Sequence, residues 1–120
     1  MTTVLVIDDS PSEMAKFRDI LTKNNFQILE ASNGEKGCSM AAEYLPDVVL
    51  MDVVMPEMNG FQATRKITRG KTTAHIPVVI VSTKNQETDR VWGKRQGARE
   101  YLVKPVDENE LVRIIRTVTE

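Results

Sequence analysis

The segment VVLMD, residues 48–52, is an unbroken run of four apolar residues that ends at once in an aspartate. Two further segments have the same form, VLVIDD at residues 4–9 and VVIVS at residues 78–82. Short, mostly β-branched runs of this kind are typical of strands buried on both faces of a parallel sheet. YLVK at 101–104 is a weaker run, and FQILE at 26–30 is partly polar and suits an edge. We therefore expect five strands.

The segments between these runs carry helix signals. Residues 10–13 (SPSE) supply an N-cap serine, a first-turn proline and a capping-box glutamate, and residues 32–35 (SNGE) repeat the S-x-x-E pattern. Further helices are expected from Asn59 to near Gly70, over 86–96, and after a cap at Asp107. The apolar side of the second helix is expected to include Met40, Tyr44 and Leu45. The 86–96 signal is the weakest, because Gly93 costs about 1 kcal/mol relative to alanine.

Five alternations of strand and helix with short connections predict a doubly wound α/β domain over residues 1–120. Sixteen basic residues against seventeen acidic ones give no basic excess, so nucleic acid is not expected as a partner. No apolar stretch approaches the ~20 residues that span a bilayer, and the only cysteine, Cys38, suits a reducing compartment. We expect a cytoplasmic monomer without membrane insertion.

Polar residues end four of the expected strands: Asp8 and Asp9, Asp52, Ser82 and Lys104. Parallel strands present their carboxyl ends at one edge of the sheet, where ligands of such folds bind. Three carboxylates placed together repel one another, and a hard cation such as Mg²⁺ relieves that repulsion. Lys104 and Ser82 suit the oxygens of a phosphoryl group. A carboxylate can also attack phosphorus, and Asp52, alone after the central strand, is the candidate nucleophile.

Three segments resemble the signature segments of one family. DDSP at 8–11, MDVVMPEMNG at 51–60 and GAREYLVKP at 97–105 are similar to those of CheY-like single-domain response-regulator receiver domains, in the same order along essentially the whole chain. The resemblance implies a flavodoxin-like (βα)5 fold with strand order 2-1-3-4-5 and no output domain. Residues 84–99 are similar to the PilH-type regulators of type IV pilus twitching motility.

The resemblance also implies roles for individual residues. Asp52 would accept a phosphoryl group from a histidine kinase of the chemotaxis type or from its phosphotransfer domain. Asp8, Asp9, Asp52 and the backbone carbonyl of Val54 would hold Mg²⁺. Ser82 and Lys104 would contact the phosphoryl oxygens, and the domain would catalyse only its own phosphorylation and dephosphorylation. The Lys104–Pro105 bond would be cis.

A switch and an output surface follow from the same resemblance. Tyr101 would turn inward as Ser82 moves toward the phosphoryl group. The face with Trp92, Tyr101 and Lys104 would then change its affinity for a downstream protein, with the pilus motor machinery as one candidate. Val54, Thr83 and Lys84 would modulate access to Asp52; Thr83 is bulkier than the residue usual there.

Other functions remain open at this point. A haloacid-dehalogenase-type phosphatase would use Asp52 as nucleophile, but it needs an acid two residues later, where this chain has Val54. A flavodoxin-like electron carrier would need hydroxyl and amide donors where Asp8 and Asp9 stand. A receiver that binds partners without being phosphorylated is a further alternative.

Overall fold

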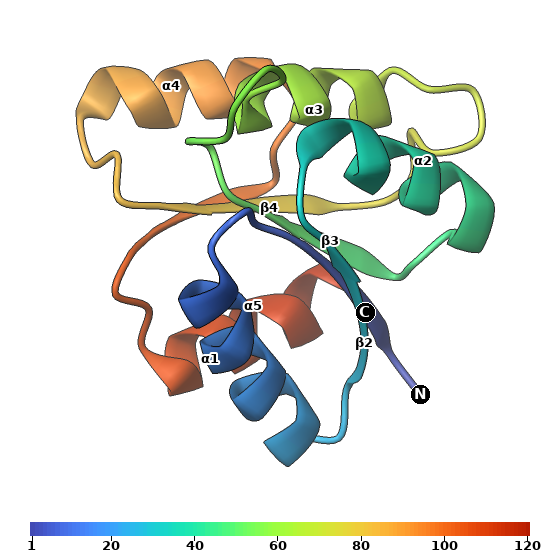
Figure 1. Cartoon of the computed structure of the whole chain (residues 1–120), viewed down its shortest axis with the longest axis vertical. Coiled ribbons are helices and arrows are strands. Elements are labelled where there is room, and N and C mark those ends of the chain that lie inside the picture. Colours follow the sequence, from blue (N-terminus) through green and yellow to red (C-terminus); the bar gives the residue numbers. More distant parts are fainter.

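A five-stranded parallel sheet forms the centre of the protein in a computed structural model, which describes residues 1–120 (Figure 1). The strand order is β2-β1-β3-β4-β5. The strands are β1 Thr3–Ile7, β2 Gln27–Ala31, β3 Val48–Met51, β4 Val78–Ser82 and β5 Glu100–Val103. This order confirms the predicted flavodoxin-like fold, with the partly polar β2 at an edge as expected.

Five helices cover the two faces of the sheet. Their bounds are α1 Pro11–Lys23, α2 Gly34–Tyr44, α3 Gly60–Thr68, α4 Glu87–Arg95 and α5 Glu108–Val118. Figure 1 shows α1 and α5 on one face and α2, α3 and α4 on the other. None of the helices has the length and apolar character needed to cross a membrane.

The alternating side chains of the strands divide the core into two clusters. On β1, Leu5 and Ile7 belong to the cluster beneath α2, α3 and α4, whereas Val4 and Val6 belong to the cluster beneath α1 and α5. All four are essentially inaccessible to solvent. Burial on both faces explains why these strands read as continuous apolar runs rather than as alternating ones.

Four of the expected helix starts are confirmed in position, with N-caps at Ser10, Asn59, Gln86 and Asp107. The Ser10 side chain accepts from the Glu13 amide, and Asp107 accepts from the Glu110 amide. The start of α2 differs by one residue from the prediction. Its N-cap is Asn33, whose side chain accepts from the Lys36 amide at 2.7 Å, so the S-x-x-E pattern at Ser32 was misleading. An asparagine N-caps as well as a serine, and the pattern did not distinguish the two.

The predicted apolar side of α2 was partly wrong. Tyr44 and Leu45 are 55% and 49% exposed, and Leu45 ends the helix in a left-handed conformation with φ of 47°. The buried side instead carries small residues, among them Gly37 and Ala41. A Cβ atom at Gly37 would collide with the side chain of Ile7, so α2 approaches β1 more closely than larger residues allow.

Close packing also explains two other glycines. A Cβ atom at Gly60 would meet the carbonyl oxygen of Asp52 and lie 2.7 Å from the Cα of Val53, so α3 begins directly against the loop after β3. At Gly93 it would lie 2.9 Å from Ile80 Cδ1 and 3.1 Å from Tyr101 Cδ2. Packing of α4 on β4 and β5 therefore compensates for the low helix propensity of this glycine.

Candidate functional site

The carboxyl ends of three strands place the key side chains at one edge of the sheet. Asp8 follows β1, Asp52 follows β3 and Lys104 follows β5. The ladder of the sheet continues past all three ends. The amides of Asp8, Asp52 and Lys104 donate to the carbonyl groups of the neighbouring strands at 3.1, 2.9 and 2.9 Å, respectively. The backbone of these residues is thereby held as firmly as that of the strands.

Three carboxylates converge at this edge, as the sequence predicted. One oxygen each of Asp8, Asp9 and Asp52 lies within 4.8 Å of the other two. Asp8 and Asp52 are 2% and 8% exposed, whereas Asp9 is exposed. The Ser10 amide donates to Asp8 Oδ1 at 2.9 Å and fixes the orientation of that carboxylate. An oxygen-only cluster open to solvent on one side is the donor set that Mg²⁺ prefers.

The ammonium group of Lys104 is surrounded by carboxylates. Its Nζ lies 2.9 Å from Asp8 Oδ2, 3.4 Å from Asp52 Oδ1 and 3.5 Å from Glu13 Oε1, and its side chain is 8% exposed. Burial lowers the pKa of Lys104, but the hydrogen bond to Asp8 and the charges of the neighbouring carboxylates outweigh burial and raise it above its usual value. The Lys104 side chain therefore stays protonated and places a positive charge beside Asp52.

The surroundings of Asp52 disfavour the ionised form of its carboxyl group. Burial and the negative charge of Asp8 raise the pKa of Asp52 from 3.8 to about 6, although Lys104 acts in the opposite direction. Near neutral pH the group is ionised, and its charge is poorly solvated. A cation bound to this carboxylate would relieve that cost.

Ser82 and its two successors lie at the end of β4. The Ser82 side chain is fully buried, and its hydroxyl accepts from the Lys84 amide at 3.2 Å. Thr83 and Lys84 are exposed, and the Lys84 ammonium lies 3.9 Å from Asp89 on α4. The structure thus places Ser82 at the same sheet edge as Asp52, between β3 and β5 in the strand order.

The ring of Tyr101 lies inside the protein, the position that the family resemblance assigns to the switched state. The side chain is 5% exposed, and its hydroxyl donates to the Lys84 carbonyl at 2.8 Å. Burial, together with the charge of Asp89, raises the pKa of Tyr101 above its usual value. The guanidinium of Arg90 lies 5.6 Å from the centre of the ring.

The three residues expected at the output surface differ in exposure. Trp92 on α4 is 48% exposed, beside the similarly exposed Val91. Tyr101 and Lys104 are almost fully buried, so they contribute little to that surface in this conformation. Trp92 and Val91 are the large apolar side chains that α4 exposes to solvent.

The loop after β3 leads from Asp52 toward α3. Val54, two residues after Asp52, is 58% exposed and carries no group that could donate a proton. A second acid, which a phosphatase of the haloacid-dehalogenase type needs at this position, is thus missing. The Lys104–Pro105 bond is cis, as the resemblance implied.

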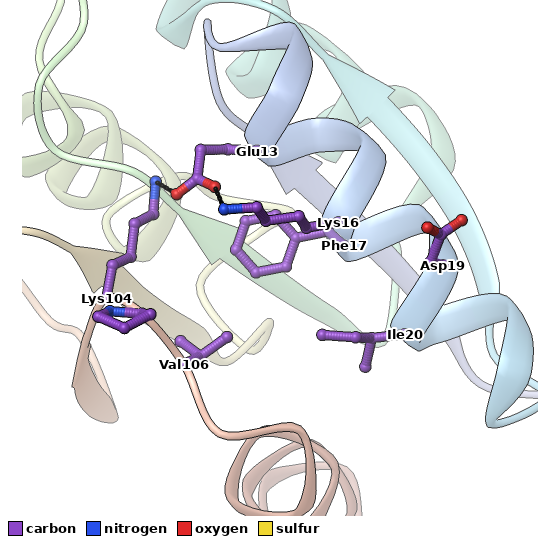
Figure 2. A pocket seen from close by; sticks show the side chains of 8 residues that line it. Glu13, Lys16, Phe17, Asp19, Ile20, Lys104 and Val106 are labelled. Atoms are coloured by element: carbon purple, nitrogen blue, oxygen red, sulfur yellow. Dashed lines mark ion pairs between the residues drawn. The ribbon is translucent and has the colours of Figure 1, made fainter.

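Two grooves flank the start of α1. A polar groove of about 410 Å³ is lined by Asp8 and Asp9 together with Arg18, Glu30 and Lys36, so the acidic cluster can be reached from it. A more apolar groove of about 290 Å³ lies between α1 and the segment after β5, and Figure 2 shows Phe17, Ile20 and Val106 along it.

Sequence reasoning missed the position of Glu13. The sequence suggested only a capping glutamate, yet its carboxylate contacts Lys104 at 3.5 Å and Lys16 at 3.2 Å (Figure 2). Burial raises the pKa of Glu13, but the hydrogen bond from Lys16 and the charge of Lys104 hold it below its usual value. The available signal was its place in the first turn after the acidic pair, close to the same sheet edge.

The doubly wound sheet thus carries clustered carboxylates and a buried lysine at its carboxyl edge, where domains of this class bind their ligands. Residues 4–116 match the response regulator receiver domain, and the chain belongs to this family of signalling domains. The predicted resemblance is thereby confirmed.

Individual relatives agree with this family. Protein PilH of Pseudomonas aeruginosa is 57% identical over 118 residues, which are 98% of each chain. Response regulator PleD of Caulobacter vibrioides is 37% identical over 116 residues, and the match covers 26% of PleD. The structure of chemotaxis protein CheY4 of Vibrio cholerae has a TM-score of 0.92 with 27% identity and 98% of each chain covered.

A further structure has the same fold. It is the receiver domain of the sensor histidine kinase PA1611 of Pseudomonas aeruginosa, with a magnesium ion coordinated in its active site cleft. Its TM-score is 0.91 at 24% identity, and the match covers 98% of this chain and 97% of that one.

Proposed function

We propose that this protein is a stand-alone response regulator that accepts a phosphoryl group on Asp52 from a histidine kinase. The observation that supports this most strongly is the contact of a buried lysine with Asp52 within a cluster of three carboxylates. Asp52 is the only member of the cluster that follows the central strand β3. Residues 4–116 match the receiver domain, and the match to PilH covers 98% of both chains, which supports one receiver domain over residues 1–120.

The residues at the sheet edge suit Mg²⁺. Asp8, Asp9 and Asp52 would hold it, with the backbone carbonyl of Val54 as a further ligand. The ion supplies charge that neutralises the cluster and the oxygens of an incoming phosphoryl group. The raised pKa of Asp52, caused by burial and by Asp8, supports this assignment, because these carboxylates lack a compensating charge beyond Lys104.

Phosphoryl transfer then follows from the positions of the side chains. A carboxylate oxygen of Asp52 attacks phosphorus, the bond from phosphorus to the imidazole nitrogen of a phosphohistidine breaks, and that nitrogen keeps the electron pair. The Lys104 ammonium, 3.4 Å from Asp52, stabilises the negative charge on the phosphoryl oxygens. The Ser82 hydroxyl would turn from the Lys84 amide to one of these oxygens. The domain would catalyse only this transfer and the later hydrolysis of the aspartyl phosphate, in which water takes the phosphoryl group as inorganic phosphate and Asp52 is regenerated.

The output follows from the link between Ser82, Lys84 and Tyr101. A Ser82 hydroxyl bound to the phosphoryl group would release the Lys84 amide, and Tyr101 holds the carbonyl of that same residue. The surface around Trp92 would change as this segment shifts. Val54, Thr83 and Lys84, which are exposed around the pocket, would set the rate at which water or a partner reaches Asp52.

The biological setting is proposed from the relative. Similarity to PilH supports a role in chemotaxis-like control of type IV pilus twitching motility, with a chemotaxis-type kinase or its phosphotransfer domain as donor. The downstream partner would be a protein, with the pilus motor machinery as a candidate. The protein would act as a cytoplasmic monomer.

Phosphorylation of purified protein tests the proposal. The wild type and Asp52→Asn are incubated with Mg²⁺ and acetyl phosphate, and intact mass spectrometry measures the gain of one phosphoryl group. We expect the gain in the wild type and none in Asp52→Asn. Glu57→Gln, an exposed carboxylate in the same loop, is the matched control and should behave as the wild type. Phosphorylation of Asp52→Asn to the wild-type extent would refute the proposal.

A capture experiment tests the output. Wild-type protein with Mg²⁺ and beryllium fluoride, and the same protein without fluoride, are used to capture partners from a lysate of the source organism. We expect one partner to be enriched by the fluoride form, and less of that partner with Trp92→Ala. Equal capture by both forms would contradict a phosphorylation-controlled switch.

A further inference from the structure

Glu13 joins the first turn of α1 to the lysine of the site. Its Oε1 lies 3.5 Å from Lys104 Nζ, and its Oε2 lies 3.2 Å from Lys16 Nζ, so one carboxylate bridges two ammonium groups (Figure 2). The bridge lies at the end of the apolar groove, beside Phe17. Lys16 is largely exposed, whereas the Lys104 side chain is 8% exposed.

The three carboxylates that contact Lys104 are not equivalent. Asp8 and Asp52 belong to the cluster whose oxygens lie within 4.8 Å of one another, and Glu13 does not. A divalent cation in that cluster would neutralise Asp8 and Asp52 and would also repel the Lys104 ammonium. Glu13 is then the only one of the three that keeps its full attraction for Lys104.

The lysine needs such an anchor. A lysine ammonium is a point charge on a flexible four-carbon chain, and it stays in one place only where its partners hold it. The centre of the Phe17 ring lies 5.9 Å from Nζ, and both residues line the apolar groove, so this neighbour offers the ammonium no carboxylate to hold it. Glu13 contacts the Lys104 ammonium through Oε1 although it is not a member of the acidic cluster, and Lys16 contacts the other oxygen of the same carboxylate.

We propose that Glu13 is a positioning residue that keeps the Lys104 ammonium beside Asp52 while a divalent cation occupies the acidic cluster. The inference rests on the proposed function and adds a residue to it. Glu13 touches neither the metal cluster nor the reacting oxygens, so it acts through Lys104. Its removal slows phosphoryl transfer and leaves cation binding intact.

The test is a double-mutant cycle between Glu13 and Lys104. Phosphorylation rates with acetyl phosphate at saturating Mg²⁺ are measured for the wild type, Glu13→Gln, Lys104→Ala and the double variant. We expect Glu13→Gln to slow phosphorylation about fivefold and to have no further effect in the Lys104→Ala background. Calorimetry should give Kd values for Mg²⁺ within about twofold of the wild type for Glu13→Gln, since Glu13 lies outside the cluster.

Asp19→Asn is the matched control. Asp19 lies on the same helix and along the same groove, and no ion pair joins it to Lys104 (Figure 2). The change removes the same charge, and the rate should equal that of the wild type. Glu13→Asp, which keeps the charge with a shorter reach, should recover part of the lost rate.

Two results would overturn the inference. One is an unchanged rate in Glu13→Gln, and the other is an equal loss in the wild-type and Lys104→Ala backgrounds. A wild type that takes up no phosphoryl group would instead refute the proposed function, so the two failures are distinguishable.

Discussion

The Tyr101 hydroxyl donates a hydrogen bond of 2.8 Å to the backbone carbonyl of Lys84. This bond joins the last strand of the sheet to the segment that follows β4. The amide of the same residue donates to the Ser82 hydroxyl at 3.2 Å. The backbone of Lys84 is therefore held by Ser82, the residue proposed to contact the phosphoryl group, through its amide and by the buried Tyr101 through its carbonyl.

Tyr101→Phe tests this link. The change removes one hydrogen bond and keeps the ring, so we expect the free energy of unfolding to fall by about 0.5–1.5 kcal/mol. Amide hydrogen exchange of residues 83–86 should become faster, because the carbonyl of Lys84 loses its partner. Tyr44→Phe, at an exposed tyrosine, is the control. Unchanged exchange over 83–86 would show that the bond does not hold this segment.

Gly93→Ala sets helix propensity against packing. Alanine is the better helix former, but its Cβ would lie 2.9 Å from Ile80 Cδ1. We expect the steric clash to outweigh the gain in helix propensity, so the free energy of unfolding should fall by about 1–3 kcal/mol. Lys94→Ala, the exposed neighbour on the same helix, should change it by less than about 0.5 kcal/mol. Urea denaturation measures both, and a stabilised Gly93→Ala would contradict the tight packing of α4.

Asp52→Asn should stabilise the metal-free protein at alkaline pH. Burial and Asp8 raise the pKa of Asp52 from 3.8 to about 6, so the folded protein binds this proton more tightly than the unfolded chain does. The contribution of Asp52 to stability therefore falls as pH rises between these two values. Asparagine does not ionise, and we expect the free energy of unfolding of Asp52→Asn to exceed that of the wild type by about 1–3 kcal/mol near pH 8.

The pH dependence and Mg²⁺ check this cause. The gain should be much smaller near pH 4, where Asp52 is largely protonated in the folded protein. Saturating Mg²⁺ should reduce or reverse it, since the ion binds the wild-type cluster, with its three carboxylates, more tightly than the variant cluster with two. Urea denaturation in a chelating buffer, at both pH values, gives the comparison. An equal gain at both would mean that charge is not the cause.

Substitution by valine should change stability in opposite directions at Thr64 and Thr73. Both are buried, but the Thr64 hydroxyl has no hydrogen-bond partner, whereas the Thr73 hydroxyl donates to the Ile67 carbonyl at 2.6 Å. Thr64→Val should raise the free energy of unfolding by about 1 kcal/mol, and Thr73→Val should lower it by about 1–2 kcal/mol. Thermal and urea denaturation measure the two, and a destabilised Thr64→Val would reveal a partner for that hydroxyl.

Most of the fold could be predicted because the strands are buried on both faces. The continuous apolar runs at 48–51 and 78–81 indicate buried parallel strands, and their alternation with helices then predicts a doubly wound α/β fold. The pocket followed from topology, since Asp8, Asp52 and Lys104 all end parallel strands. Strand order came from the family resemblance, because local patterns carry no information on which strands are neighbours.

The errors on α2 and on Glu13 share one cause, because both depend on contacts that form only in the folded protein. Tyr44 and Leu45 fit the helical spacing but are exposed at the C-terminal end of α2, and only the packing of the folded protein shows which side of the helix is buried. The contact of Glu13 with Lys104 joins residues that are far apart in the chain. Its capping pattern suggested a local role, and long-range ion pairs have no local signature.

The contact of Gly60 with the Asp52 carbonyl limits where this protein can be engineered. An inserted sensor or tag between β3 and α3 would push that helix away from the loop that follows Asp52. The exposed turn at Lys71, Thr72 and His75 precedes β4 at the opposite end of the strands, where chain can be added without touching the pocket. A fluorescent reporter of phosphorylation is best built there.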